Sequence, residues 1–217
     1  MARKRSIERS PQSHKNYFVV DANVLAYAAL PRITKRVKVN ISDVNERERA
    51  ERCLKWWDII KHQLRTDKAR VYVPDVCIAE AFKVLAKWYY RKKYFQTSIS
   101  YNQAKKRLRN FVSTSHTKMA QAGRKVAVHD IATNRDIVIA VDRFFEPLYK
   151  GKDDVSVPDL IVLAVVKYLI DFYDMPREYL YILTCDRKLV ALARKISGLP
   201  KAINPSEKRY DPESTFI

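Results

Sequence analysis

The sequence predicts an α/β fold with a central, mostly parallel β-sheet. Short runs of β-branched and aromatic residues alternate along the 217 residues with longer segments whose apolar residues recur at helical spacing. Most strand-like runs are followed directly by a helical pattern, which is typical of parallel strands joined by helical crossovers. The length suffices for one such domain with a sizeable core, so we predict a single domain over residues 16–217.

Five short segments have the composition of strands. They are rich in Val, Ile, Leu and Tyr, and several are closed by Pro or by a polar residue. The predicted strands cover residues 17–20, 71–73, 126–128, 179–183 and 202–205. The runs YFVV (17–20) and YLYIL (179–183) have the strongest pattern, and VAV (126–128) is weak.

Helical periodicity and capping signals predict the segments between these strands. Apolar spacing predicts helices at roughly 22–30, 43–66, 75 to the mid-90s and 187–196. Three further helices are expected to begin at the capping boxes SYNQ (100–103), TNRD (133–136) and SVPD (156–159). Gly123 and Gly151 are the expected ends of the first two. The helix after SVPD is apolar nearly all round, so we expect it to be central.

The composition favours a partner that carries negative charge. The formal net charge is +18 with a pI near 9.8, which is typical of proteins that bind an anionic polymer or surface. With only three glycines, a Gly-rich phosphate loop is nearly excluded. The longest fully apolar run, LIVLAVV (160–166), is too short to span a bilayer.

The cysteines and the first residues predict a cytoplasmic protein. Cys53, Cys77 and Cys185 are far apart, form no CxxC pair and lie among apolar residues, so we expect buried free thiols in a reducing compartment. Residues 1–15 are basic and have no apolar segment behind them. They are predicted to form a flexible tail rather than a signal peptide.

Four carboxylates occupy equivalent places in the predicted fold. Asp21 and Asp186 follow strands, whereas Glu80 and Asp159 lie in the first turns of helices. In a parallel sheet the carboxyl ends of strands and the following helix N-termini share one edge, where such folds place their sites. Singly, each residue is explained as a helix cap or a solvated helix residue. Together they would repel, and a divalent cation bound by hard oxygen ligands, Mg²⁺ or Mn²⁺, would relieve that repulsion.

The same segments resemble the PIN-domain nucleases. The matching stretches are VVDANVL, VPDVCIAE, VPDLIVLAVV and ILTCDRKL, which occur in the family's order between about residues 16 and 205. The best-populated branch of that family is the VapC-type toxin ribonucleases of prokaryotic toxin–antitoxin pairs. The resemblance implies a PIN-like α/β/α sandwich in which this chain carries an inserted basic helical segment at about 87–125.

The resemblance also implies a metal-dependent endoribonuclease that hydrolyses RNA phosphodiester bonds. Asp21, Glu80, Asp159 and Asp186 match the family's acidic cluster and would bind Mg²⁺ or Mn²⁺. Asn23 and Thr184 match polar positions that would orient the ligands or a water. Bound metal would lower the pKa of the attacking water and stabilise the leaving 3′ oxygen. A small antitoxin protein and a homodimer are the partners that the family implies.

A long basic segment follows Glu80. No acidic residue occurs between Glu80 and Asp130, and aromatic residues are interleaved with the cations. A solvated face normally mixes both signs of charge, so we favour an RNA-binding surface. The alternative for the aromatics is core packing, which we expect for Trp88. The predicted RNA-binding residues are Lys87, Arg91, Lys92, Lys93, Lys105, Lys106, Arg107 and Arg109.

Two other functions compete with a ribonuclease. A non-catalytic RNA-binding or scaffold protein with a PIN fold would explain the charge, but it would have no reason to keep four repelling carboxylates. An unrelated α/β hydrolase or phosphatase is disfavoured, because the sequence has no GxSxG and no Walker motif. The sequence leaves open whether the enzyme is a toxin or an RNA-processing nuclease.

Overall fold

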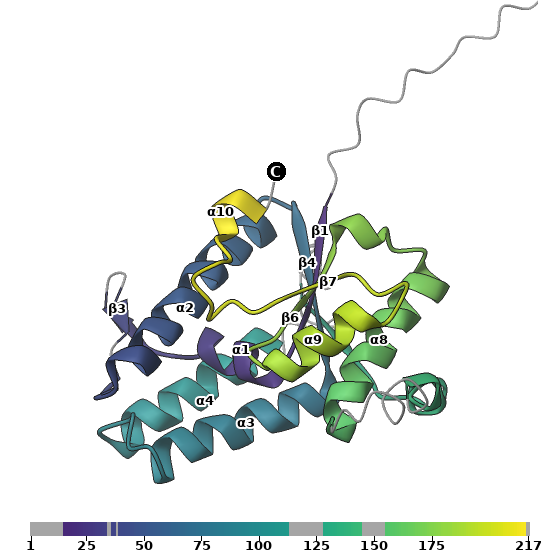
Figure 1. Ribbon diagram of the computed structural model, residues 1–217. Coiled ribbons are helices and arrows are strands. Elements are labelled where there is room, and N and C mark those ends of the chain that lie inside the picture. The colour runs from purple at the N-terminus through teal and green to yellow at the C-terminus, as the bar shows by residue number, and fades with distance from the viewer. Residues whose placement is uncertain (1–14, 34–35, 38, 113–127, 145–154, 216–217) are drawn as a thin grey trace, which may run out of the picture.

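Five parallel strands form the central sheet of the computed structural model, which describes residues 15–33, 36–37, 39–112, 128–144 and 155–215 (Figure 1). Their order across the sheet is β5-β4-β1-β6-β7. The strands are β1 (Asn16–Val20), β4 (Ala69–Pro74), β5 (Val128–Ile131), β6 (Leu180–Leu183) and β7 (Lys201–Ile203). All four pairings between neighbours are parallel, so the predicted α/β fold is confirmed.

Helices cover both faces of this sheet. In Figure 1, α2, α3 and α4 lie on one side and α8 on the other. The helices are α1 (Ala22–Ala28), α2 (Val44–Arg65), α3 (Asp75–Tyr90), α4 (Ser98–Val112), α6 (Arg135–Ala140), α8 (Val157–Tyr173), α9 (Arg187–Lys195) and α10 (Pro212–Thr215), with a 3₁₀ turn at Arg177–Tyr179. Among the described helices, none has both the length and the apolar character to cross a membrane.

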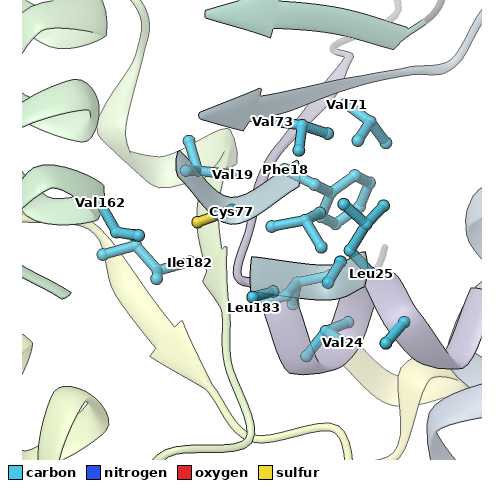
Figure 2. Packing of buried hydrophobic residues seen from close by; sticks show 14 of the residues in the cluster. Phe18, Val19, Val24, Leu25, Val71, Val73, Cys77, Val162, Ile182 and Leu183 are labelled. Atoms are coloured by element: carbon cyan, nitrogen blue, oxygen red, sulfur yellow. The ribbon is translucent and has the colours of Figure 1, made fainter. Parts of the chain in front are cut away.

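The core forms where the central strands meet α1 and α8. Successive side chains of a strand point to opposite faces, so a strand that is buried throughout must be covered on both sides. Phe18 and Val19 of β1 are both fully buried. Figure 2 shows Phe18 beside Leu25 of α1, and Val162 of α8 beside Ile182 of β6. The predicted central position of the helix after SVPD is therefore confirmed.

Two of the three predicted capping boxes are displaced. The helix expected to begin at SYNQ (100–103) is α4, which begins at Ser98, and Thr97 and Ser100 exchange the cap hydrogen bonds instead (Ser100 N to Thr97 Oγ1, 3.2 Å; Thr97 N to Ser100 Oγ, 3.4 Å). Thr97 and Ser100 can both cap the free N–H groups at this helix start, and Thr97, the earlier of the two, takes the capping position.

The second displaced box lies at α6. Asn134 rather than Thr133 caps this helix, because its Oδ1 accepts the N–H of Ile137 at 2.9 Å. Thr133 is instead hydrogen-bonded to the Asp75 carboxylate at the start of α3. The third box is confirmed, with Ser156 as the N-cap of α8.

Two further differences concern segment ends. The helix predicted from Asp75 to the mid-90s ends at Tyr90, and Lys93 then adopts a left-handed φ of 55° that no helix continues. A two-stranded antiparallel ribbon, β2 (Arg32–Ile33) with β3 (Arg36–Val37), was not predicted, because strands of two residues carry no periodicity.

Some predictions lie outside the described residues. These are the tail before Lys15, the expected helix ends Gly123 and Gly151, and the basic segment beyond Val112.

Candidate functional site

Asp21 lies at the carboxyl end of β1, where the chain turns into α1. Its backbone N–H donates to the carbonyl of Leu183 on the neighbouring strand β6 at 2.9 Å, which continues the ladder to the edge of the sheet. Its Oδ1 accepts the N–H of Ala22 at 2.5 Å, so the carboxylate caps α1. The residue is only 5% exposed. A helix cap does not require such burial, because most caps satisfy their N–H groups at the surface.

Thr184 connects this carboxylate to the next strand end. It is fully buried, its Oγ1 donates to Asp21 Oδ2 at 2.9 Å, and the same oxygen accepts the N–H of Asp186 at 2.9 Å. Asp186 in turn caps α9 by accepting the N–H of Lys188 at 2.6 Å. One hydroxyl therefore fixes the position of Asp21 relative to the loop that carries Asp186.

The other two predicted carboxylates come from helix N-termini at the same edge. Asp159 lies in the first turn of α8 and is half-buried, and its Oδ2 accepts the hydroxyl of Ser156 at 2.6 Å. Glu80 lies in the second turn of α3 and is also half-buried. Each of the four thus follows a strand or begins a helix at one edge of the sheet.

Two of these carboxylates, Asp21 and Asp159, have raised pKa values, mainly because they are buried and partly because other carboxylates are near. Burial, together with the negative charges of Asp159 and Glu80, raises the pKa of Asp21 from 3.8 to about 6, against the opposing hydrogen bonds from Thr184 and Ala22. Burial and the charge of Asp186 also raise the pKa of Asp159. The charges of Glu80 and Asp159 therefore act on Asp21, and that of Asp186 acts on Asp159.

The donor chemistry of this edge suits a hard divalent cation. Its polar groups are carboxylate and hydroxyl oxygens, which Mg²⁺ and Mn²⁺ prefer. Within the described residues, no three His, Cys, Asp or Glu side chains are close enough together to hold a metal ion as they stand. The carboxylates thus form an electrostatic cluster rather than a closed coordination shell.

Cys77 of α3, one of the thiols expected to be buried and free, is an apolar neighbour of this cluster. It is fully buried, and the charges of Asp21, Glu80 and Asp159 act on it. Burial is the largest of the causes that raise the pKa of its thiol well above 9. A thiol held neutral in this way is a wall of the site and not a ligand.

The predicted RNA-binding residues lie at the end of α3, in the loop after it and on α4. Lys105 is half-buried and the other seven are exposed, so all can reach solvent. Most of the aromatics between them, however, pack inward: Trp88, Tyr94, Phe95 and Tyr101 are buried. Tyr89 stacks on Tyr101 at 4.5 Å between ring centroids. Core packing therefore explains most of these aromatics, and Tyr90, 62% exposed, is the one of this set that is open to a base.

A groove that the sequence did not predict opens beside Asn23 and Asp186. It has a volume of about 1320 Å³ and lies between α2, α9 and the loop 204–209. We call it the α2–α9 groove. Its lining holds six cations and five carboxylates: Arg49, Arg52, Arg187, Arg194, Lys208 and Arg209 with Asp43, Glu46, Glu48, Asp186 and Glu207. Asn23, one of the predicted site residues, is exposed to this groove.

Solved structures similar to this chain include the following three. A structure of FitAB bound to a DNA fragment has a TM-score of 0.51 and 14% identity, and the match covers 89% of this chain and 98% of that one. FitAcB from Neisseria gonorrhoeae matches with a TM-score of 0.46 and 15% identity, over 87% of this chain and 97% of its own. VapBC2 from Rickettsia felis, bound to a DNA fragment from their promoter, matches with a TM-score of 0.47 and 11% identity, over 87% and 98%.

These matches concern the fold. The five-stranded parallel sheet with its flanking helices is the one shared with the FitAB chain, so the PIN-like architecture predicted from the sequence is confirmed. No protein-family model and no curated protein matches the sequence. The roles of the individual side chains therefore have to be argued from their own geometry.

Proposed function

We propose that this protein is a metal-dependent endoribonuclease that hydrolyses RNA phosphodiester bonds. The observation that carries the proposal is Asp21: a buried carboxylate with a pKa raised to about 6, within electrostatic reach of Asp159 and Glu80. Burying a charge among like charges costs stability unless a cation offsets the repulsion. A site that binds Mg²⁺ or Mn²⁺ gives that arrangement a purpose, which helix capping alone does not.

Asp21, Glu80, Asp159 and Asp186 would hold the metal. When bound, Mg²⁺ would polarise a phosphate oxygen and make a bound water a better nucleophile at neutral pH. Above its pKa of about 6, Asp21 is mainly ionised and ready to bind a cation. Thr184 holds Asp21 Oδ2 in place through its 2.9 Å hydrogen bond, and Ser156 does the same for Asp159.

The substrate follows from the charge of the chain and the resemblance. A net charge of +18 favours a polyanion, and the PIN nucleases that the motifs resemble cleave RNA to leave 5′-phosphate and 3′-hydroxyl ends. Asn23 is exposed beside Asp186 and is placed to contact a phosphate or a water there. The resemblance to VapC-type toxins leads us to propose a small partner protein that covers the acidic edge.

The proposal is tested with purified protein and a mixed single-stranded RNA. The RNA is incubated with Mg²⁺, with Mn²⁺ and with EDTA, beside an Asp21→Asn variant. We expect cutting with either metal, and none with EDTA or in the variant. Binding without cutting, unchanged by Asp21→Asn, would contradict a nuclease and leave a non-catalytic RNA-binding protein with the carboxylates as helix caps.

A further inference from the structure

The wall of the α2–α9 groove formed by residues 204–209 is held rigidly. Asn204 is 1% exposed, and its Nδ2 donates to the carbonyl of Cys185 at 3.2 Å, directly before Asp186. Its Oδ1 accepts both the N–H and the hydroxyl of Ser206, at 3.0 and 2.6 Å. Arg52 of α2 donates through Nε to the carbonyl of Ser206 at 2.6 Å. The loop is thus fixed to α2 on one side and to the Asp186 loop on the other.

Two carboxylates in the groove are each shared between two cations. Glu48 accepts from Arg52 at 3.1 Å and lies 3.7 Å from Lys208. Both neighbours hold the pKa of Glu48 below its ordinary value. Glu207 lies 2.6 Å from Arg209 and 3.4 Å from Arg187. Because one carboxylate cannot neutralise two cations, this arrangement leaves positive charge over.

That charge is accessible to solvent. The side chains of Arg187 and Lys208 are 76% and 79% exposed. Within the described residues, Arg49 has no carboxylate partner, yet its charge acts on the thiol of Cys185 beside Asp186. Elsewhere in the lining, Arg194 donates to the hydroxyl of Tyr210, and the Arg209 guanidinium lies 4.9 Å from the centroid of that ring.

Two further acids of the groove lining, Asp43 and Glu46, already have partners. Asp43 caps α2 by accepting the N–H of Glu46 at 3.1 Å, and Glu46 forms an ion pair with Lys92. The lining therefore carries a small excess of positive charge, and it includes the loop 204–209 as well as Asn23 and Asp186. A volume of about 1320 Å³ exceeds the roughly 300–1,000 Å³ of a small-molecule pocket, which favours a polymer as the occupant.

We propose that the α2–α9 groove binds the sugar–phosphate backbone of single-stranded RNA and leads it to the acidic edge at Asp186. The assignment rests on the proposed ribonuclease activity. The phosphates of an RNA backbone complement the exposed cations of the groove lining, such as Arg187 and Lys208. An acidic protein segment would also complement the cations, but its carboxylates have no function at the acidic edge, whereas a phosphodiester there is the substrate.

The test measures RNA binding without cutting. A fluorescein-labelled single-stranded RNA of mixed sequence is titrated with protein in EDTA, and its fluorescence anisotropy is recorded. The titration is repeated at salt concentrations from about 50 to about 300 mM, over which contacts to phosphates weaken. The groove variant is Arg49→Glu/Arg187→Glu. Its matched control is Lys68→Glu/Lys201→Glu, which makes the same charge change at exposed residues beside the amino ends of β4 and β7, at the opposite edge of the sheet.

We expect the groove variant to bind roughly tenfold or more weakly than the control, with a salt dependence shallower by about 1–2 in log–log slope. Equal affinity and slope in the two variants would overturn the groove assignment. Circular dichroism melting of each variant checks that both fold, and Arg49→Ala alone gives a milder version of the same test should the double variant unfold.

The outcomes also separate the two proposals. Weakened binding by the groove variant, in a protein that never cuts RNA with Mg²⁺ or Mn²⁺, would refute the nuclease and keep the groove as an RNA site. Metal-dependent cutting with unaltered binding in the groove variant would keep the nuclease and refute the groove. Arg49-dependent binding of poly-glutamate, with no RNA binding at all, would overturn the assignment in favour of an acidic protein partner.

Discussion

Asp21 and Asp186 occupy equivalent positions in the fold but different environments. Each follows one of two neighbouring parallel strands, β1 and β6, and each caps the helix that comes next. Asp21 is 5% exposed and its pKa is raised to about 6, whereas Asp186 is half-exposed and lines the α2–α9 groove. The two carboxylates differ in burial because β1 is the central strand of the sheet, whereas β6 lies nearer its edge.

The comparison shows that the same local motif serves two purposes. At Asp186, the cap carries no burial cost and Asn would preserve it, although Asn would lose the charge proposed to hold the metal. At Asp21, burial beside other carboxylates adds a cost that a cap does not justify. The same substitution, Asp to Asn, should therefore change the stability of the protein differently at the two positions.

The largest expected effect is that of Asp21→Asn, which should lower activity while it raises stability. Loss of a metal-binding carboxylate should lower RNA cutting roughly a thousandfold. At pH 8 the same variant should be more stable than the wild type by about 1–3 kcal/mol, because it removes a buried charge. Asp186→Asn keeps its cap and should alter stability by less than about 0.5 kcal/mol. Urea denaturation and RNA cleavage assays check both, and a destabilised Asp21→Asn protein would contradict the comparison.

The second prediction concerns pH. The folded-state pKa of Asp21 lies above its unfolded value of 3.8, so the folded protein binds this proton more tightly. Protonation therefore stabilises the fold: the gain is complete below about pH 4 and is lost as the pH rises through about 6. Between pH 4 and 8 this one group should change the unfolding free energy by about 3 kcal/mol.

Urea unfolding at several pH values measures this dependence. Because other groups titrate in the same range, the decisive quantity is the difference between wild type and Asp21→Asn. That difference should grow from pH 4 to pH 8. Asp186→Asn retains Asp21 and should keep the contribution of Asp21 to the pH profile. A wild-type profile parallel to that of Asp21→Asn would show that Asp21 is not the buried acid described here.

The third prediction concerns divalent cations. A metal that binds ionised carboxylates competes with protons, so Mg²⁺ or Mn²⁺ should raise the melting temperature more at pH 8 than at pH 5.5. At 100 times its dissociation constant the ion would stabilise the fold by about 2.7 kcal/mol. Asp21→Asn should abolish most of this shift. Glu51→Gln, which removes an exposed carboxylate of α2, should leave it intact, and an equal shift in both variants would indicate nonspecific ion binding.

Much of this edge of the molecule could be predicted from the sequence. The strands before Asp21 and Asp186 are strongly apolar runs, and parallel topology then brings their ends together whatever their separation in the chain. The degree of burial could not be predicted, because it depends on how α1, α3 and α8 pack over Asp21. The caps predicted at Ser100 and Thr133 were wrong, since neighbouring Ser, Thr and Asn side chains compete to cap the same N–H groups.

The α2–α9 groove was missed for a physical reason. Its cations come from three separate segments, and Glu48 and Glu207 lie among them, so no continuous charge run marks it. The run that the sequence does show, from Lys87 to Arg109, is exposed as predicted, but its aromatics mostly pack inward. Its role in RNA binding stays a prediction. Asn204, which fixes the groove wall, lies in a short buried segment whose pattern indicates only a strand.

The smallest predicted effect tests the residue that joins the two carboxylates. Thr184→Val keeps the shape of the side chain but removes the hydroxyl that donates to Asp21 and accepts from the Asp186 N–H. The unpaired, part-buried N–H should cost about 1–3 kcal/mol of stability. Because the hydroxyl lowers the pKa of Asp21, its loss should raise that pKa and shift the pH dependence of stability upward.

Thr184→Ser is the matched control, because it retains the hydroxyl and loses only a methyl group. It should keep the pH midpoint of the stability profile. It should also keep the pH dependence of the rise in melting temperature that Mg²⁺ or Mn²⁺ causes. For each Thr184 variant, the free energy of unfolding is compared with that of the same variant carrying Asp21→Asn. The readout is the pH at which this difference in free energy reaches half its maximum. A Val variant with the wild-type midpoint would mean that Thr184 supports the loop but does not tune Asp21, and Asp21 would then owe its pKa to burial and its acidic neighbours alone.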